Sequence, residues 1–343
     1  MLHLANTLYV MARGAYLHLD HDTVRVEVER ATQLQVPLLQ LSGLVTFGDV
    51  LLSPALVARC AEDGRAVTLL DHNGRFKARI VGPTGGNVLL RRDQHAALSD
   101  PERTLTIARH IVAGKVQNER QVLLRGARES DDVADARALG DAARALADAM
   151  TTVQVCRDLD ELRGIEGAAA RRYFEVFDRL VRVDREAFQM VERNRRPPLD
   201  RINSLLSFCY TLVLSDCVAA AEGVGLDPQV GYLHALRPGR PALALDLVEE
   251  LRSPVADRLA LALINRRQLA PNDFEERPGG AVSLTDAGRK TVVVAYQERK
   301  QDEVPHQILG RKIPVGLVSH IQARFMARHL RGDLEYYPPF LIR

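Results

Sequence analysis

Three side chains of this sequence have types that together can perform metal-dependent chemistry: Glu166, His234 and Glu249. An imidazole and two carboxylates form a ligand set that suits Mn²⁺ or Mg²⁺ and leaves positions open for a substrate. A site of that kind is typical of phosphoryl transfer. The hypothesis requires that these residues, which lie far apart in the sequence, meet in the fold.

Glu166 is closely flanked by Gly164 and Gly167. Each glycine costs a helix roughly 1 kcal/mol relative to alanine. The pair therefore suggests that something approaches the backbone at this point. A solvated glutamate on a helix face is the alternative interpretation, and the local pattern alone leaves both open.

His234 lies just before a turn rich in arginine and proline, and a segment with leucines at helical spacing follows. Asp246, Glu249 and Glu250 lie off that leucine stripe, so a carboxylate of the returning helix can meet the histidine. Two alternatives remain open. The histidine can be a hydrogen-bonded structural residue, and Glu249 and Glu250 beside Arg252 can form a solvated charged face.

The first ninety or so residues, which precede these side chains, read as short strands separated by glycine-containing turns. One helix interrupts them at residues 53–62, with Ser53 as its N-cap and Pro54 as its first residue. The predicted strands are residues 7–11, 16–19, 24–28, 38–41 and 67–70. This part of the chain is predicted to be a small sheet domain.

From about residue 95 the apolar residues recur at helical spacing. Residues 158–161 form a capping box that opens the helix of Glu166, and residues 127–135 have the composition of a loop. The prediction is an α+β fold with two domains. A small N-terminal β-rich domain occupies residues 1–93, and a larger all-helical C-terminal domain occupies residues 94–343.

The composition is that of a globular protein, with 343 residues of which 46% are hydrophobic. The 46 Lys and Arg nearly balance 44 Asp and Glu, so a nucleic-acid surface requires segregation of charge. The four cysteines have neither zinc-ligand nor disulfide spacing, and the apolar stretches fall short of a membrane span. We expect a soluble, cytoplasmic protein that does not contact a membrane.

Several blocks of the sequence resemble, in order, the universal CRISPR adaptation integrase family. They are Glu-Leu-Arg-Gly-Ile-Glu-Gly-Ala-Ala at 161–169, Tyr-Phe at 173–174, and the segments 203–210, 225–228 and 231–251. The ordered combination is far more specific than any single motif, and the resemblance covers essentially the whole chain. Residues 6–10 and 91–94 resemble type I members, which implies a type I-C-like subtype.

The resemblance implies that Glu166, His234 and Glu249 are the catalytic residues and hold Mg²⁺ or Mn²⁺. Many members have aspartate at the last position, where this chain has Glu249. The extra methylene leaves the ligand type unchanged. Asp246 or Glu250 remains an alternative third ligand, or a group that supports the ligands.

The resemblance further implies insertion of short DNA fragments into a CRISPR repeat array by attack of a 3′-hydroxyl on a phosphodiester. The implied partners are prespacer DNA, repeat and leader DNA, a second copy of the chain bound through the sheet domain, and a small second adaptation protein that completes a heterohexamer. Two alternatives are a metal-dependent nuclease or resolvase of branched DNA and a catalytically silent DNA-binding scaffold.

DNA binding also requires cations near the metal, and most of them would contact phosphates. Each candidate can instead be an ordinary surface cation or a partner in a helix ion pair. The candidates are Arg163, Arg171, Arg172, Arg237, Arg240, Arg252, Arg289, Lys290, Arg299 and Lys300.

Overall fold

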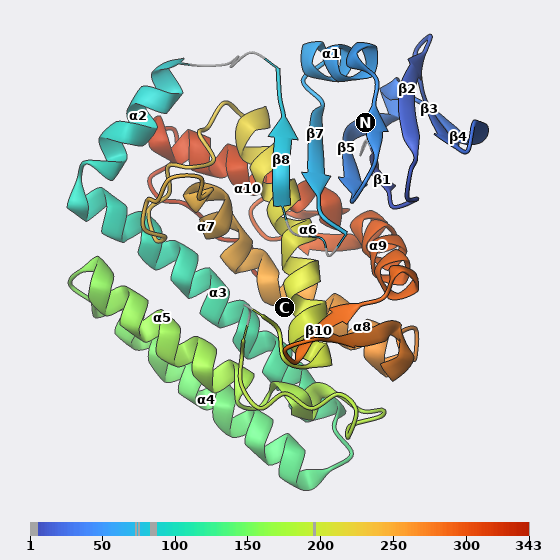
Figure 1. Ribbon diagram of the computed structural model, residues 1–343. Helices are drawn as coiled ribbons and strands as arrows, with labels where there is room; N and C mark the ends of the chain where they lie inside the picture. The colour runs from blue at the N-terminus through green and yellow to red at the C-terminus, as the bar shows by residue number, and fades with distance from the viewer. Residues whose placement is uncertain (1–5, 73, 75, 83–87, 195–196, 343) are drawn as a thin grey trace. The chain divides into compact units, whose positions relative to one another are not determined.

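The computed structural model describes residues 6–72, 74, 76–82, 88–194 and 197–342. The chain divides into two compact units, Met1–Gly86 and Asn87–Arg343. The first is β-rich and the second is mainly helical (Figure 1), as predicted for the fold class. The division lies between residues 86 and 87. The boundary that the sequence predicts, after residue 93, lies within α2 (Val88–Leu98).

The first unit contains two four-stranded sheets and one helix. One sheet has the order β1-β5-β7-β8 and the other β4-β3-β2-β6. The strands are β1 (Asn6–Val10), β2 (Tyr16–Asp20), β3 (Thr23–Val28), β4 (Ala31–Pro37), β5 (Leu41–Phe47), β6 (Leu51–Leu52), β7 (Ala66–Leu70) and β8 (Phe76–Ile80).

Alternation of apolar residues explains the packing of this unit. Val24 and Val26 on β3 are both buried in its core, together with Leu17 of β2. The predicted helix is present as α1 (Pro54–Glu62), and the Ser53 hydroxyl accepts a hydrogen bond from the Leu56 amide as its N-cap. The predicted strand at residues 38–41 is wrong for its first three residues, which form a 3-10 turn, because the chain bends there before β5 begins at Leu41.

The second unit is built around long helices. They are α2, α3 (Pro101–Glu129), α4 (Val133–Val155), α5 (Leu159–Phe174), α6 (Arg201–Gly223), α7 (Ala242–Leu251), α8 (Arg258–Asn265), α9 (Asp286–Gln301) and α10 (Val315–Leu330). Helices α3, α4 and α5 lie side by side, and α7 packs against both α3 and α6 (Figure 1).

Two features of this unit differ from the prediction. Two short antiparallel hairpins interrupt the helices, β9 (Phe274–Arg277) with β10 (Ala281–Leu284), and β11 (Glu303–His306) with β12 (Arg311–Pro314). The loop predicted at residues 127–135 is much shorter, because α3 continues to Glu129 and Asp132 caps α4 by accepting hydrogen bonds from the amides of Ala134 and Asp135.

Helix α6 is the most apolar long helix of the described residues. Among the helices there, it alone has the length and hydropathy that a membrane crossing requires. Most of its most apolar window, 61%, is nevertheless buried inside the unit, where the helix packs against α7 and α10. These are the properties of a core helix.

Candidate functional site

Each of the three predicted residues is carried by a different segment of the helical unit. Glu166 lies on α5, whose first turn is capped by the Asp158 carboxylate accepting from the amides of Asp160 and Glu161. Glu249 lies near the end of α7. His234 lies in the loop that leads into α7, and packing of α3 against both α5 and α7 brings the segments together.

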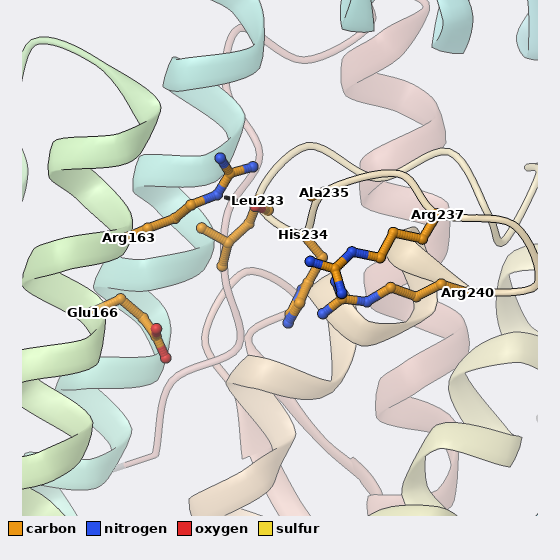
Figure 2. Close-up of a pocket in the computed structure, with 7 residues that line it drawn as sticks. All are labelled: Arg163, Glu166, Leu233, His234, Ala235, Arg237 and Arg240. Carbon is orange, nitrogen blue, oxygen red and sulfur yellow. Dashed lines mark hydrogen bonds between the residues drawn. The ribbon is translucent and has the colours of Figure 1, made fainter.

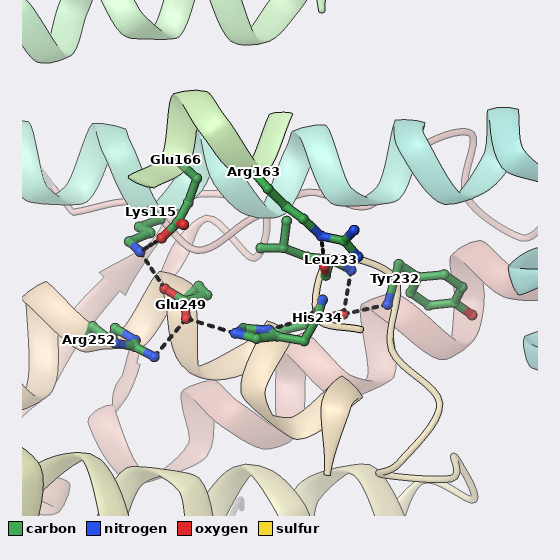
Figure 3. Close-up of polar contacts among 9 residues, drawn as sticks. Lys115, Arg163, Glu166, Tyr232, Leu233, His234, Glu249 and Arg252 are labelled. Carbon is green, nitrogen blue, oxygen red and sulfur yellow. Dashed lines mark hydrogen bonds and ion pairs between the residues drawn. The ribbon is translucent and has the colours of Figure 1, made fainter. Parts of the chain in front are cut away.

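A cluster of charges joins these helices, and its centre is a lysine that the sequence analysis did not single out (Figure 3). Lys115 of α3 donates a hydrogen bond to Glu166 Oε1, and its Nζ lies 2.8 Å from Glu249 Oε2. Arg252 Nη2 lies 2.8 Å from Glu249 Oε1. In the sequence, Lys115 stands among apolar residues at helical spacing, which is a signal of burial. A lysine by itself usually indicates a surface position.

The sequence alternative of a solvated face on α7 is wrong, because the helix is buried on all sides. Asp246, Glu249 and Glu250 are each at most 2% exposed. The three carboxylates differ in their partners, and the partners define their roles.

Asp246 fixes the histidine. Its Oδ1 lies 2.7 Å from His234 Nδ1 and accepts from the His234 amide, while its Oδ2 accepts from the amides of Tyr232 and Leu233. This arrangement assigns the ring proton to Nδ1, since a carboxylate only accepts. His234 Nε2 then keeps its lone pair and faces Glu249 Oε1 at 3.6 Å.

The surrounding cations set the charge of Glu249. Burial by itself would raise the pKa of this carboxyl, but Arg252, Lys115 and His234 outweigh burial and hold the pKa well below its usual range. Burial likewise opposes the charge of Lys115, yet Glu249 and Glu166 raise the pKa of its ammonium above the ordinary value. Both groups are therefore charged at neutral pH.

Glu250 points away from this cluster and anchors the end of the chain. Its carboxylate accepts hydrogen bonds from the Tyr337 hydroxyl, the Phe340 amide and the Gln322 side chain. Burial raises the pKa of Glu250 to about 7, and these hydrogen bonds limit the rise. Glu250 therefore supports the packing of the chain terminus and does not contact the ligand set.

A π-helical turn, η3 (Arg252–Asp257), follows α7 directly. Such turns are uncommon and frequently occur at functional sites. Within it, Arg252 lies 4.8 Å above the ring of Tyr210, and the Tyr210 hydroxyl donates to Asp257 at 2.7 Å. These contacts fix Arg252, and through it they fix Glu249.

A pocket of about 350 Å³ lies beside Glu166 and His234, two of the three predicted ligands (Figure 2). Its lining combines Glu166 and His234 with three arginines and two apolar residues. The lining residues are Arg163, Glu166, Leu233, His234, Ala235, Arg237 and Arg240. Arg163 is held in place because its Nε donates to the Leu233 carbonyl at 2.9 Å. The arrangement provides positive charge beside a carboxylate and an imidazole, as a phosphate-containing substrate requires.

The glycines that flank Glu166 are exposed, and a Cβ added at Gly164 or Gly167 would meet no atom of the described residues within 4 Å. The expected close approach to this backbone therefore does not come from within the described chain. The surface of α5 is open at this point.

The other candidate cations fall into two groups. Arg171 and Lys290 are exposed, and Arg172 and Arg299 are partly exposed in helix ion pairs. Arg252, Arg289 and Lys300, which are also candidate DNA contacts, are buried in this structure. Arg289 donates to the Leu284 carbonyl, and Lys300 pairs with Asp216 at 2.9 Å.

The donor set fits a divalent cation in its chemistry. His234 Nε2 offers a lone pair, and Glu249 Oε2 is a buried carboxylate oxygen whose nearby cation is the Lys115 ammonium at 2.8 Å. Within the described part of the chain, however, three or more His, Cys, Asp or Glu side chains are nowhere gathered as a ready-made metal site. The Lys115 ammonium stands between the two glutamates instead.

Comparison with known proteins identifies the family. The family described as CRISPR associated protein Cas1 matches residues 8–298. The chain belongs to the Cas1 family. Among curated proteins, the CRISPR-associated endonuclease Cas1 1 of Moorella thermoacetica is 59% identical over 99% of both chains. The protein of the same name from Chlorobaculum tepidum is 46% identical over 98% of both chains.

Solved structures share the fold. A Cas1 protein from Thermotoga maritima covers 95% of this chain and 97% of its own, with a TM-score of 0.81 and 24% identity. A casposase bound to integration product has a TM-score of 0.82 at 22% identity, covering 97% of this chain and 93% of its own. A Cas6-RT-Cas1–Cas2 complex chain also has a TM-score of 0.82 at 22% identity, with 99% of this chain and 36% of that chain covered. The predicted family and fold class are confirmed.

Proposed function

We propose that this Cas1 chain is a metal-dependent DNA endonuclease and integrase of CRISPR adaptation, with its site at Glu166, His234 and Glu249. It inserts short DNA fragments into a CRISPR repeat by attack of a 3′-hydroxyl on a phosphodiester. The observation that carries the assignment is that Glu166 and His234 line a pocket together with three arginines, while Glu249 lies next to both through Lys115 and His234. Mg²⁺ or Mn²⁺ is the proposed metal, because the donors are carboxylate oxygens and one imidazole nitrogen.

The residues of the chain prepare the site before any substrate arrives. Asp246 holds His234 in the tautomer whose Nε2 can donate its lone pair to a cation. Arg252 holds the Glu249 carboxylate ionised and oriented. His234 and Glu249 are therefore already oriented, whereas the Lys115 ammonium lies between the two glutamates that a metal would use.

The DNA backbone is bound by the arginines that line the pocket. Arg163, Arg237 and Arg240 present guanidinium groups whose forked geometry matches phosphate oxygens. When bound, the divalent cation supplies Lewis acidity that polarises the scissile phosphate and favours ionisation of the attacking hydroxyl. Transesterification conserves the number of phosphodiester bonds, so ATP is not required.

The proposed assembly follows the family. Two copies pair through their sheet domains, and two such dimers join a dimer of a small second adaptation protein into a heterohexamer. The structural neighbour from a Cas6-RT-Cas1–Cas2 complex supports a second adaptation protein as partner, and the casposase bound to integration product supports DNA as partner. We place the protein in the cytoplasm, where CRISPR arrays are found.

A joining assay tests the proposal. The purified chain and its small partner are incubated with a short duplex bearing 3′-hydroxyl ends and a supercoiled repeat plasmid, with Mn²⁺, Mg²⁺ or chelator. Joining is expected with metal and should fall to background for Glu166→Ala, His234→Ala and Glu249→Ala. Lys312→Ala, at an exposed lysine outside the candidate DNA contacts, is the matched control. Cleavage without joining by the wild type would instead support a nuclease that uses water.

A further inference from the structure

Lys115 occupies an unusual position for a lysine. Its side chain is only 4% exposed, and its ammonium contacts both Glu166 and Glu249, two of the three proposed ligands. A buried lysine is costly unless carboxylates compensate its charge, so this position is specified by the site. A divalent cation bound by the same carboxylates would compete with this ammonium for them.

The charge balance makes this competition strong. In the cluster, Lys115 and Arg252 carry two positive charges that offset the two negative charges of Glu166 and Glu249. Adding a divalent cation without moving either residue would place two further positive charges in a largely buried space. Arg252 is fixed against the Tyr210 ring, whereas a lysine has a flexible stem of four methylenes. Lys115 is therefore the group that can yield.

A second acceptor for the lysine exists one turn along the same helix. Glu119 follows Lys115 by four residues on α3, a spacing that places two side chains about 5–6 Å apart at Cβ. Glu119 is 2% exposed and its Oε2 is buried without a hydrogen-bond partner among the described residues. Burial raises the pKa of the Glu119 carboxyl to about 8, and the charge of Lys115 acts in the opposite direction, so a closer ammonium would favour the ionised carboxylate. Rotation of the lysine side chain alone can bring the two groups together.

We propose that Lys115 is a resident cation of the metal centre, which holds Glu166 and Glu249 together in the metal-free protein and moves to Glu119 when the divalent ion binds. The proposal rests on the metal site of the proposed function. It gives a reason for the buried, unpartnered Glu119 oxygen, which the ligand set does not explain. It also explains how the unliganded protein keeps two buried or half-buried glutamates close to each other.

The test is a double-mutant cycle on Mn²⁺ affinity, measured from the electron paramagnetic resonance signal of free Mn²⁺ without DNA. Lys115→Met removes the competitor, so it should bind Mn²⁺ at least about tenfold more tightly than the wild type. Glu119→Gln removes the carboxyl that can pair with the displaced ammonium and should weaken binding about threefold or more, but should have no effect in the Lys115→Met background. Lys312→Met, at an exposed lysine, is the matched control and should leave affinity unchanged.

Thermal unfolding supplies a second measurement that does not depend on affinity. In chelator, Lys115→Met should unfold at a lower temperature than the wild type, because two carboxylates lose a partner, and Mn²⁺ should restore more stability to it than to the wild type. If Lys115→Met does not fold, Lys115→Gln and Glu119→Gln carry the same comparison. Unchanged or weaker Mn²⁺ binding by the lysine variants would overturn the inference while leaving the metal site intact. Wild type that binds no Mn²⁺, or binding unaffected by His234→Ala, would overturn the metal site itself and the inference with it.

Discussion

Glu249 and Glu250 are neighbours on α7, but their carboxylates lie in opposite electrostatic surroundings. Glu249 faces Lys115 and Arg252, and its pKa is held low despite burial. Glu250 faces neutral donors, the Tyr337 hydroxyl, an amide side chain and a backbone N–H, and burial raises its pKa to about 7. The side of α7 that carries Glu249 stabilises an ionised carboxylate, whereas the side that carries Glu250 anchors the segment of Tyr337 and Phe340 by hydrogen bonds.

The second face continues beyond Glu250. Asn118 of α3 donates hydrogen bonds to the carbonyls of Glu250 and Phe340. A Cβ at Gly114 would come within 2.5 Å of the Pro339 side chain, so glycine is required for the chain terminus to pack this closely. Identical carboxyl groups therefore acquire different surroundings from their partners, and their chemical type alone does not assign a role.

The largest expected effect separates the two neighbours by activity. Glu249→Gln keeps the size of the side chain but removes the charge, and it should lower metal-dependent joining by about 10³-fold or more. Glu250→Gln should lower joining by only about threefold, because its carboxyl does not face the pocket. Initial rates at saturating Mn²⁺, on protein whose circular dichroism matches the wild type, check this. Equal losses would mean that the two faces do not have separate roles.

For the free energy of unfolding, we expect the larger effect at Glu250. Glu250→Ala leaves the Tyr337 hydroxyl, the Phe340 amide and the Gln322 amide buried without their acceptor, which should cost about 3 kcal/mol or more of unfolding free energy. Urea unfolding measures the loss, with Glu175→Ala on an exposed ion pair as the control. A change below about 0.5 kcal/mol would remove the anchoring role from Glu250.

The pH dependence of stability tests the same contrast at Asp257. Like Glu250, this buried carboxyl accepts from neutral donors, here tyrosine hydroxyls. Burial raises the pKa of Asp257 to about 6, above an unfolded value of about 3.9. The folded state therefore binds more protons between these values. This contribution to stability is full below about pH 4 and is lost as pH rises through about 6, by about 3 kcal/mol.

The difference between wild type and Asp257→Asn isolates this contribution. The variant should show a flatter dependence of unfolding free energy on pH between about 4 and about 6. Urea unfolding at a series of pH values provides the measurement. A variant that keeps the full wild-type slope would assign the pH dependence to another group.

The smallest effect concerns the positioning of the histidine. Asp246→Asn keeps an acceptor for the backbone amides but weakens the hold on His234 Nδ1, so Mn²⁺ affinity or joining should fall about 10- to 100-fold. Raising the Mn²⁺ concentration should recover part of the activity of Asp246→Asn, but none of the activity of His234→Ala. Complete inactivity at all Mn²⁺ concentrations would indicate that Asp246 is itself a ligand.

The sequence by itself determined the family, the α+β class and the three proposed ligands. The helices that carry Glu166 and Glu249 follow from local signals, namely the Asp158 cap and the leucine stripe of α7, whereas the family and the three proposed ligands follow from the resemblance of the ordered motifs. The order of the motifs can be recognised without knowing which faces of the helices meet in the fold.

Only the tertiary structure decided which carboxylate has which role. No local pattern predicts that Lys115 meets Glu166 and Glu249, since the packing of α3 against α5 and α7 creates these contacts across 51 and 134 residues of sequence. It also left Asp246 and Glu250 open as ligands, because their sequence spacing is equally compatible with each role. The physical reason is that the charge state and orientation of a buried group depend on burial and on the neighbours that packing supplies, and local spacing encodes neither.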